Sequence, residues 1–406
     1  MLMLLASVLS QTDRQLVNIL LEPIKHDLHA SDAQMGLLSG LYYVAFYVLA
    51  SIPIAWMADR GSRRAIIAAC VGTWSLATAL SGTVSFYWQI ATARAFAAAG
   101  EGGSSPAMYS LIADIFSQRA RTRALAVISC GIAIGSGVGI LVGGVLLEQL
   151  GWRGVFVVVS LAGFVLAPVI MWALPEPRRG QPVSAAPKAS LFRTIATLWN
   201  IPTFRMLALA ATCGGATGYG VLAWTPTFLT RVHGMSHAEV GVKLGVATAV
   251  GLLLGNLSSG YLADRLGQRD SRWSIWVASV GLLISVPVGL FSVFVGDGNL
   301  SVITLGLFSY FRAYWPPPVT ACTISIADSR SQAVASACIL FFISLGGAIG
   351  PFVMGSLNDS LNSAYGPSAV RYSVALAMSA NAIGGVILLL TGPMLQRELL
   401  RKASAS

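Results

Sequence analysis

The chain has 406 residues, of which 55% are hydrophobic and only 10% are charged, and its mean hydropathy is +0.72. Soluble domains carry roughly 25% charged residues, so this composition excludes a soluble enzyme, a disordered protein and a coiled coil. The net charge of +10 lies in short basic clusters between long apolar runs. That distribution is typical of the loops of a membrane protein rather than of a nucleic-acid-binding surface.

Twelve apolar runs long enough to cross a bilayer follow one another along the chain. They lie near 1–22, 33–57, 65–84, 86–114, 123–149, 152–174, 204–230, 237–263, 272–295, 299–327, 332–357 and 369–395. The first run starts at residue 1 without a basic flank, so we expect a cytoplasmic segment to precede it in the natural protein.

One long connection, rich in proline and basic residues, divides the runs into two sets of six. Its composition is typical of a flexible tether between packed units. We therefore predict an all-α membrane protein with twelve transmembrane helices in two six-helix pseudo-repeats. The predicted parts are an N-terminal bundle at 1–174, a cytoplasmic linker at 175–203, a C-terminal bundle at 204–396 and a cytoplasmic tail at 397–406.

The basic residues predict the orientation. With both termini placed inside, 18 of the 26 Lys and Arg fall in cytoplasmic segments and five fall on the opposite side, as the positive-inside rule requires. The other three, Arg14, Arg94 and Arg312, fall inside predicted spans. We expect an integral membrane protein, in the plasma (inner) membrane if the source is bacterial, that acts as a monomer.

The two halves repeat one another in sequence. Ala58-Asp59-Arg60 follows the second run, and Ala263-Asp264-Arg265 follows the eighth, 205 residues later. The fourth and tenth runs both end in Ile-Ala-Asp, and the fifth and eleventh are both rich in glycine. Three coincidences in the same order indicate a duplicated six-helix unit.

The loop at 260–269, with its Asp-Arg-x-Gly-x-Arg pattern, resembles the signature loop of the major facilitator superfamily, and this resemblance extends over the whole chain. The loop at 55–64 departs from the signature, with Ala55 for its first glycine, and Ile140 stands where antiporters of the superfamily often have proline. We predict that the charges of the two loops form clusters that hold the cytoplasmic side closed. These gate residues are Asp59, Arg60, Arg63, Arg64, Asp264, Arg265 and Arg269.

Three stretches are similar to a narrower branch, the spinster family. They are Thr12-Asp13-Arg14-Gln15, the segment from Arg94 to Gly102, and the segment from Trp224 to Ser236. Members of this family move lysophospholipids and sphingosine 1-phosphate, so the resemblance implies an amphipathic anionic lipid as substrate.

The first half carries ionisable residues inside its predicted spans. Each costs at least about 2.5–3.5 kcal/mol at mid-bilayer, so such residues usually face a cavity and are paired. Arg94 and Glu101 are seven residues apart on one helix face, about 10 Å along the axis, and their candidate partners are Asp13 and Arg14. We predict that Arg14 and Arg94 attract the lipid phosphate, because the guanidinium fork matches that geometry. Glu101, and more weakly Asp13, is the predicted proton carrier.

The second half has one mid-span charge, Arg312, followed by three prolines at 316–318. Prolines remove backbone donors, so we predict a break or kink in the tenth span beside that arginine. Irregular backbone is where transporters often bind substrate. The seventh span has a similar predicted weak point at Gly214–Gly220. Aromatic residues near these two points, together with Arg312, are predicted to line the apolar side of the binding site: Tyr219, Trp224, Tyr310 and Trp315.

These features favour a proton-coupled secondary transporter that works by alternating access, with a proton-coupled drug or organic-anion efflux transporter as the alternative. The sequence contains no His-Glu-x-x-His, Gly-x-Ser-x-Gly or nucleotide-binding loop, so we predict no catalytic residues. His233 and His237 have no carboxylate or cysteine to complete a metal site. We expect no cofactor other than protons as the coupling ion, membrane lipid and an amphipathic solute as partners, and no nucleic acid.

Overall fold

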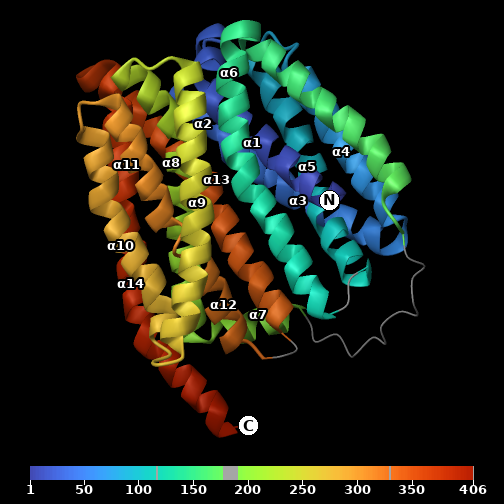
Figure 1. Ribbon diagram of the computed structural model, residues 1–406, viewed down its shortest axis with the longest axis vertical. Coiled ribbons are helices and arrows are strands. Elements are labelled where there is room, and N and C mark those ends of the chain that lie inside the picture. The colour runs from blue at the N-terminus through green and yellow to red at the C-terminus, as the bar shows by residue number, and fades with distance from the viewer. Residues whose placement is uncertain (116–117, 177–190, 329–330, 406) are drawn as a thin grey trace. The chain divides into compact units, whose positions relative to one another are not determined.

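The computed structural model describes residues 1–115, 118–176, 191–328 and 331–405, and within these residues it is helical without any strand (Figure 1). The helices are α1 Leu2–Asp27, α2 Asp32–Ser39, α3 Leu41–Arg60, α4 Arg63–Ser81, α5 Tyr87–Ile115, α6 Gln118–Ala173, α7 Leu191–Trp199, α8 Pro202–His233, α9 His237–Gly267, α10 Trp273–Phe294, α11 Gly298–Arg312, α12 Pro316–Ile326, α13 Gln332–Tyr365 and α14 Ala369–Ala405, with a short 3₁₀ turn at Gly366–Ser368.

Helix breaks fall where the sequence predicts them. The fifth and sixth predicted spans form one continuous element, α6, which is interrupted at Gly151 with φ 64°. Glycine adopts this left-handed conformation at little cost, whereas a side chain would be strained there. The predicted break in the tenth span is also confirmed, because α11 ends at Arg312 and α12 begins at Pro316.

Seven segments of the described chain are long and apolar enough to cross a membrane. Two of them, Cys130–Ala173 and Val334–Arg401, have 44 and 68 residues, which is enough for two spans each. Helices α1 and α5 are not among the seven because their polar and charged residues lower their mean hydropathy, and α11 and α12 are each too short. The all-helical fold is confirmed, and the number of twelve spans stays a prediction.

The chain forms two compact units. Unit 1 comprises Met1–Gly180, Ala223–Ala249 and Gly355–Val370, and unit 2 comprises Gln181–Leu222, Val250–Met354 and Arg371–Ser406. This grouping follows spatial proximity, whereas the predicted bundles at 1–174 and 204–396 follow the sequence repeat. The repeat-based division stays a prediction.

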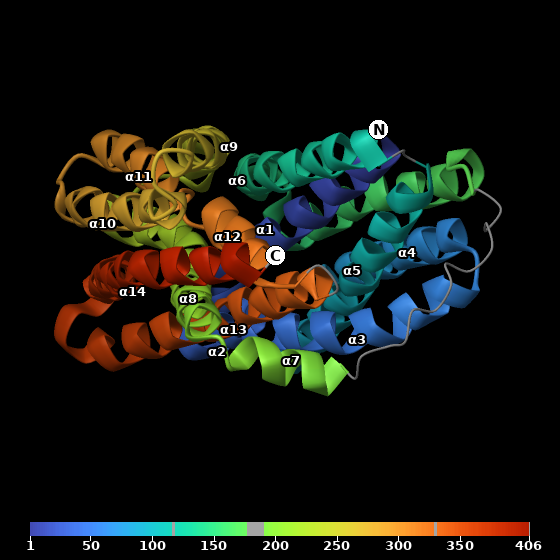
Figure 2. The ribbon, with the colours of Figure 1, turned by 90° about the horizontal axis from the view of Figure 1, so that it is seen from below.

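In unit 1, α5 is flanked by α3 and α4, which both pack on it (Figure 2). Helix α6 packs closely along α1. A Cβ atom at Gly135 of α6 would lie 2.5 Å from the Val8 carbonyl oxygen, and one at Gly139 would lie 2.6 Å from that of Thr12. The glycine-rich fifth span therefore lets two backbones come into contact.

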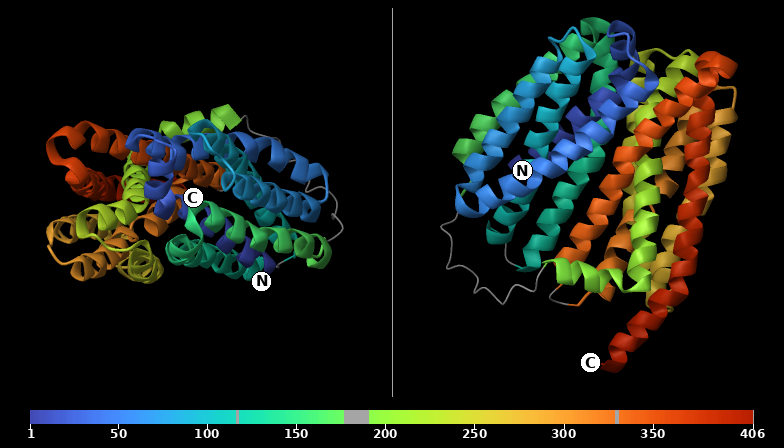
Figure 3. Two further views of the ribbon diagram at one scale, coloured as in Figure 1. Left: turned by 90° about the horizontal axis from the view of Figure 1, so that it is seen from above. Right: turned by 180° about the vertical axis from the view of Figure 1, so that it is seen from behind.

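Unit 2 repeats this arrangement. A Cβ atom at Gly346 or Gly350 of α13 would collide with backbone oxygens of α8, those of Thr212 and Ala216. The eleventh span thus packs on the seventh as the fifth packs on the first. In the same unit α10 lies beside α11, and α14 is the long red helix that runs to the C-terminus in the right panel of Figure 3.

Candidate coupling and substrate site

A buried ion pair joins the first and fourth predicted spans in unit 1. The Arg94 Nη2 atom lies 2.7 Å from Asp13 Oδ2, and the side chains of both residues are at most 3% exposed. The Thr78 hydroxyl donates to Asp13 Oδ1 at 2.7 Å, and Arg94 Nη1 donates to the same hydroxyl at 3.4 Å. The predicted pairing of Arg94 with Asp13 is confirmed, and Thr78 of α4 completes the arrangement.

Glu101 of α5 is 1% exposed and takes its hydrogen bonds from hydroxyl groups. Its Oε2 atom accepts from Ser10 at 2.9 Å and also from the Tyr43 hydroxyl. Its Oε1 atom is buried and accepts no hydrogen bond from any residue that the structure describes. Glu101 also interacts electrostatically with Asp13. The two neighbouring carboxyl groups therefore have different partners: Asp13 pairs with a charged guanidinium, whereas Glu101 accepts from neutral hydroxyl groups.

Arg14 lies over the ring of Tyr43, with its guanidinium carbon 4.5 Å from the ring centroid. A cation over an aromatic face is stabilised by about 0.5–2 kcal/mol, depending on solvent exposure. Tyr43 therefore contacts both Arg14 and Glu101. With all four ionisable groups charged, the cluster of Asp13, Arg14, Arg94 and Glu101 sums to zero, and the addition of one proton leaves it at +1.

In unit 2, the half-buried Arg312 packs against Gly218, and a Cβ atom at this glycine would lie 2.4 Å from Arg312 Nη1. Among the described residues Arg312 makes no ion pair or hydrogen bond, and its electrostatic neighbour is Tyr219. Tyr310 lies 5.1 Å from Phe311, ring centroid to centroid, and its hydroxyl shares a 2.7 Å hydrogen bond with that of Tyr314. This arrangement places Arg312 near Tyr219, with Tyr310 two residues before it on α11.

The two predicted tryptophans are packing residues in the structure. Trp315 is 3% exposed, and its indole ring packs against Gly214 of α8 within unit 2. Trp224 is 1% exposed and contacts Gly355 within unit 1. Both rings therefore pack between helices, and a direct contact of either ring with the substrate stays a prediction.

Two residues outside the predicted gate set, Glu176 and Trp56, contact the first cytoplasmic loop. Glu176 accepts from Ser62 and from the Arg63 amide, the latter at 2.6 Å, and it lies 3.8 Å from Arg64 Nε. The guanidinium of Arg60 lies 3.8 Å from the Trp56 ring centroid. The side chain of Asp59 lies outside the described residues.

In the second signature loop, Asp264, Arg265 and Arg269 are all exposed. Arg265 Nη1 donates to the Tyr261 hydroxyl at 2.9 Å, one helical turn away. These positions agree with a surface cluster, and its gating role stays a prediction.

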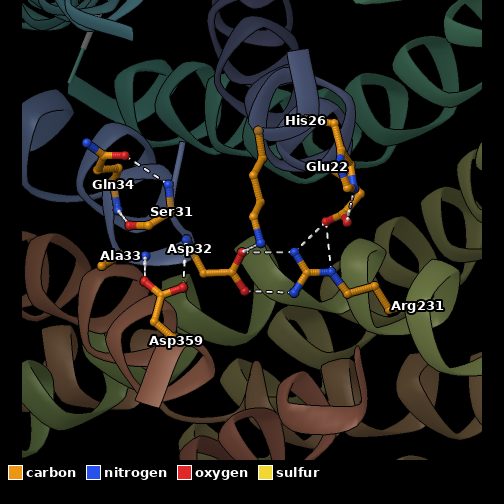
Figure 4. A network of polar contacts seen from close by, with 9 residues as sticks. Glu22, His26, Ser31, Asp32, Ala33, Gln34, Arg231 and Asp359 are labelled. Atoms are coloured by element: carbon orange, nitrogen blue, oxygen red, sulfur yellow. Dashed lines mark hydrogen bonds and ion pairs between the residues drawn. The ribbon is translucent and has the colours of Figure 1, made fainter. Parts of the chain in front are cut away.

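The largest ion-pair network of the described residues lies at the turn between α1 and α2 (Figure 4). Arg231, at the end of α8, donates from Nη1 and Nη2 to the two carboxylate oxygens of Asp32 at 2.7 and 2.9 Å. Its Nη2 atom also lies 2.6 Å from Glu22 Oε2. Lys25 Nζ lies 2.6 Å from Asp32 Oδ1. A bidentate pair of this kind is geometrically specific and stronger than a neutral hydrogen bond.

Asp359 of α13 joins this network through the backbone. Its Oδ1 and Oδ2 atoms accept from the amides of Asp32 and Ala33 at 3.0 and 2.8 Å, which satisfies two free donors at the start of α2. We call the residues Glu22, Lys25, Asp32, Arg231 and Asp359 the α1–α2 network. All five belong to unit 1, but Arg231 and Asp359 come from the second sequence repeat.

Comparisons with known proteins agree with this architecture. The sequence profile described as Major Facilitator Superfamily matches residues 3–351. An MFS-type efflux pump of Mycolicibacterium smegmatis is 35% identical over 404 residues, which cover 98% of this chain and 93% of the pump. Protein spinster homolog 1 of Xenopus tropicalis is 24% identical over 97% of this chain and 80% of its own length.

Among solved structures, a bacterial homologue of the human lysosomal transporter Spinster, in an inward-facing and unoccupied conformation, superposes with a TM-score of 0.87. The two chains are 26% identical over 98% of this chain and 96% of the other. The chain belongs to the Major Facilitator Superfamily. It is an integral membrane transporter rather than an enzyme, and within the superfamily it resembles the spinster proteins.

Proposed function

We propose that this protein is a proton-coupled secondary transporter that moves an amphipathic anionic lipid, a lysophospholipid or a sphingosine 1-phosphate-like molecule, across the membrane by alternating access. The observation that carries the proposal is the charge-balanced cluster of unit 1, in which one buried oxygen of Glu101 has no donor among the residues that the structure describes. The likeness to spinster proteins over nearly the whole chain supports the lipid as substrate.

The proton in this scheme resides on Glu101. A buried carboxylate needs donors for its oxygens, and Glu101 receives them only on Oε2 from the residues described. A proton on the carboxyl removes the charge that Arg94 and Arg14 balance, so the cluster becomes net positive. An anionic headgroup then binds more favourably, and proton and lipid are linked through charge without touching each other.

Arg94 takes part in this exchange through its ion pair with Asp13. In the structure its Nη2 atom is held by Asp13 Oδ2 at 2.7 Å, so a phosphate that binds Arg94 must compete with that carboxylate. Competition of this kind makes lipid binding depend on the protonation of Asp13 and Glu101. Arg14 over Tyr43 and Arg312 in unit 2 are the further guanidinium groups that we assign to the substrate.

Closure of the two sides is assigned to separate clusters. The loop charges from Asp59 to Arg64 and from Asp264 to Arg269 are proposed to close the cytoplasmic side, on which the predicted orientation also places both termini. The α1–α2 network, on the opposite side in the predicted orientation, is proposed to hold that side closed. Its ion pairs must open for the substrate to pass there.

The alternative function is proton-coupled efflux of a drug or an organic anion. It is favoured by the 35% identity to the mycobacterial efflux pump over nearly the full length of both proteins. The same buried cluster would serve this function, because coupling by charge does not require a lipid tail.

The test is uptake into proteoliposomes with and without an imposed pH gradient. A fluorescent lysophospholipid and a single-chain lipid phosphate are compared with a small organic anion that has no acyl chain. Saturable lipid flux that the gradient accelerates supports the proposal. Gradient-driven flux of the small anion alone supports the alternative function. Flux that does not depend on the pH gradient contradicts both functions.

A further inference from the structure

A narrow groove runs between α3 and α5 of unit 1, and none of the functions above uses it. Its volume is about 380 Å³. The alanines 91, 95 and 99 of α5 lie along its length at intervals of four residues, which place them on one helix face. Because Ala95 is buried and the other two are half-buried, these small side chains form the floor.

Aromatic side chains form the walls of this groove. Phe46 of α3 is 43% exposed, and Trp88 and Phe96 of α5 are 65% and 60% exposed. Helix α3 lies in a segment apolar and long enough to span the membrane, and α5 is the predicted fourth span. We expect the exposed rings of Phe46 and Phe96, which lie within these two spans, to face hydrocarbon rather than water.

The dimensions of the groove suit one hydrocarbon chain. Its lining on α5 runs from Tyr87 to Ala99, which is about 18 Å along the helix, close to the roughly 15 Å thickness of one leaflet's hydrocarbon. A volume of 380 Å³ over that length, with a radius of about 1.4 Å added on each side for the atoms that fill it, makes the groove about 8 Å across. A row of methylenes is about 4 Å wide by carbon–carbon contact, whereas a helix needs 10–12 Å.

One end of the groove has the features of a membrane interface. Tyr42 and Tyr87 lie there, and the Tyr87 hydroxyl donates to the Gln34 carbonyl oxygen at 2.8 Å. Tyr87 is the first residue of α5, and tyrosine and tryptophan concentrate at the level of lipid headgroups. The floor of alanines then leads from this end towards the middle of the membrane.

We propose that this groove binds a single acyl chain of a membrane lipid, in the leaflet at the Tyr87 end of α5, with the headgroup beside Tyr42 and Tyr87. The binding site is separate from the buried charge cluster and does not depend on which solute is transported. The groove shares α5 with that cluster, and on α3 its lining residues Tyr42 and Phe46 are direct neighbours of Tyr43 and Tyr47. A bound chain therefore packs against the helix segments that hold Tyr43 on Glu101.

Photo-crosslinking tests this site directly. The protein is reconstituted in phosphatidylcholine containing a lipid with a diazirine in the middle of its acyl chain, and labelled peptides are identified by mass spectrometry. We expect labels concentrated on α3 and α5 residues of the groove. Ala91→Phe fills the floor and displaces the acyl chain from an area about the size of one aromatic ring. It should therefore reduce labelling of the groove about tenfold.

A second variant and a control keep the test decisive. Phe96→Ala removes a wall without adding bulk, so it should reduce groove labelling even if Ala91→Phe does not fold. Phe291→Ala removes an aromatic side chain of α10 that is 52% exposed, and it should leave groove labelling unchanged. Labelling spread evenly over all exposed helix faces, or unaffected by Ala91→Phe, would overturn the proposal.

Discussion

Replacement of Arg231 by alanine should open the α1–α2 network. The substitution removes the bidentate contact with Asp32 and the contact with Glu22, and the side chains of these two carboxylates are 3% and 17% exposed. Loss of one partner of a buried ion pair costs about 3–5 kcal/mol. Lys25 remains 2.6 Å from Asp32, so we expect the lower end of that range, about 3 kcal/mol. This corresponds to a change of about 100-fold in the population of the opened state.

Hydrogen exchange measures this opening at α2. Asp32 and Ala33 donate to Asp359, so their amides, and those of the turn that follows, exchange when the network separates. We expect peptides that contain Asp32–Ser39 to exchange about 100-fold faster in Arg231→Ala. Arg231→Lys retains the charge but loses the planar fork, so its effect should be intermediate.

The matched control is Arg153→Ala. Arg153 pairs with Asp27 at 2.5 Å in the same unit, but the two side chains are 41% and 43% exposed, and exposed pairs contribute about 0–1 kcal/mol. Its effect on exchange at α2 should be less than about fivefold. Equal exchange in the Arg231 and Arg153 variants would refute the view that the α1–α2 network holds this end together.

Two further predictions concern the charge and the packing of the helices, and both are tested by thermal unfolding in detergent. Asp13→Asn leaves the buried Arg94 without its ion pair and should destabilise by about 3 kcal/mol; the double variant with Arg94→Gln should recover part of this loss, and no recovery would show that the pair is not the cause. Gly350→Ala should destabilise by about 1–3 kcal/mol, because its Cβ collides with the Ala216 backbone. Gly72→Ala in α4, where a Cβ meets nothing within 4 Å, should be neutral or slightly stabilising, and equal effects of the two glycine variants would contradict the packing argument.

Local features of the fold could be predicted because the residues that cause them are adjacent in sequence. Gly151 lies between two apolar runs, and the prolines at 316–318 begin four residues after Arg312, so both breaks appear as changes in composition. The pairing of Arg94 with Asp13 could be predicted for a different reason. Few charges lie inside the membrane, and charge neutrality there leaves few candidate partners.

The α1–α2 network could not be predicted in this way. Its residues lie at helix ends, where charges are common and need no partner. Arg231 and Glu22 are 209 positions apart, and charge counting identifies Arg231 only as one more basic residue outside the membrane. Tyr43 was missed for a similar reason, because a tyrosine in an apolar span carries no sign that its hydroxyl contacts Glu101.

The measurement that tests the central proposal most directly is lipid flux by Glu101→Gln in proteoliposomes over a range of pH gradients. The glutamine retains the shape of the glutamic acid and imitates its protonated form, so lipid binding should persist, measured separately by displacement of a fluorescent lysophospholipid. We expect the wild-type flux to rise with the imposed gradient and the flux of Glu101→Gln to be the same at every gradient. Asp13→Asn should show the same loss more weakly. If Glu101→Gln transports lipid with the wild-type dependence on pH, the proton is carried elsewhere and the proposed coupling is wrong.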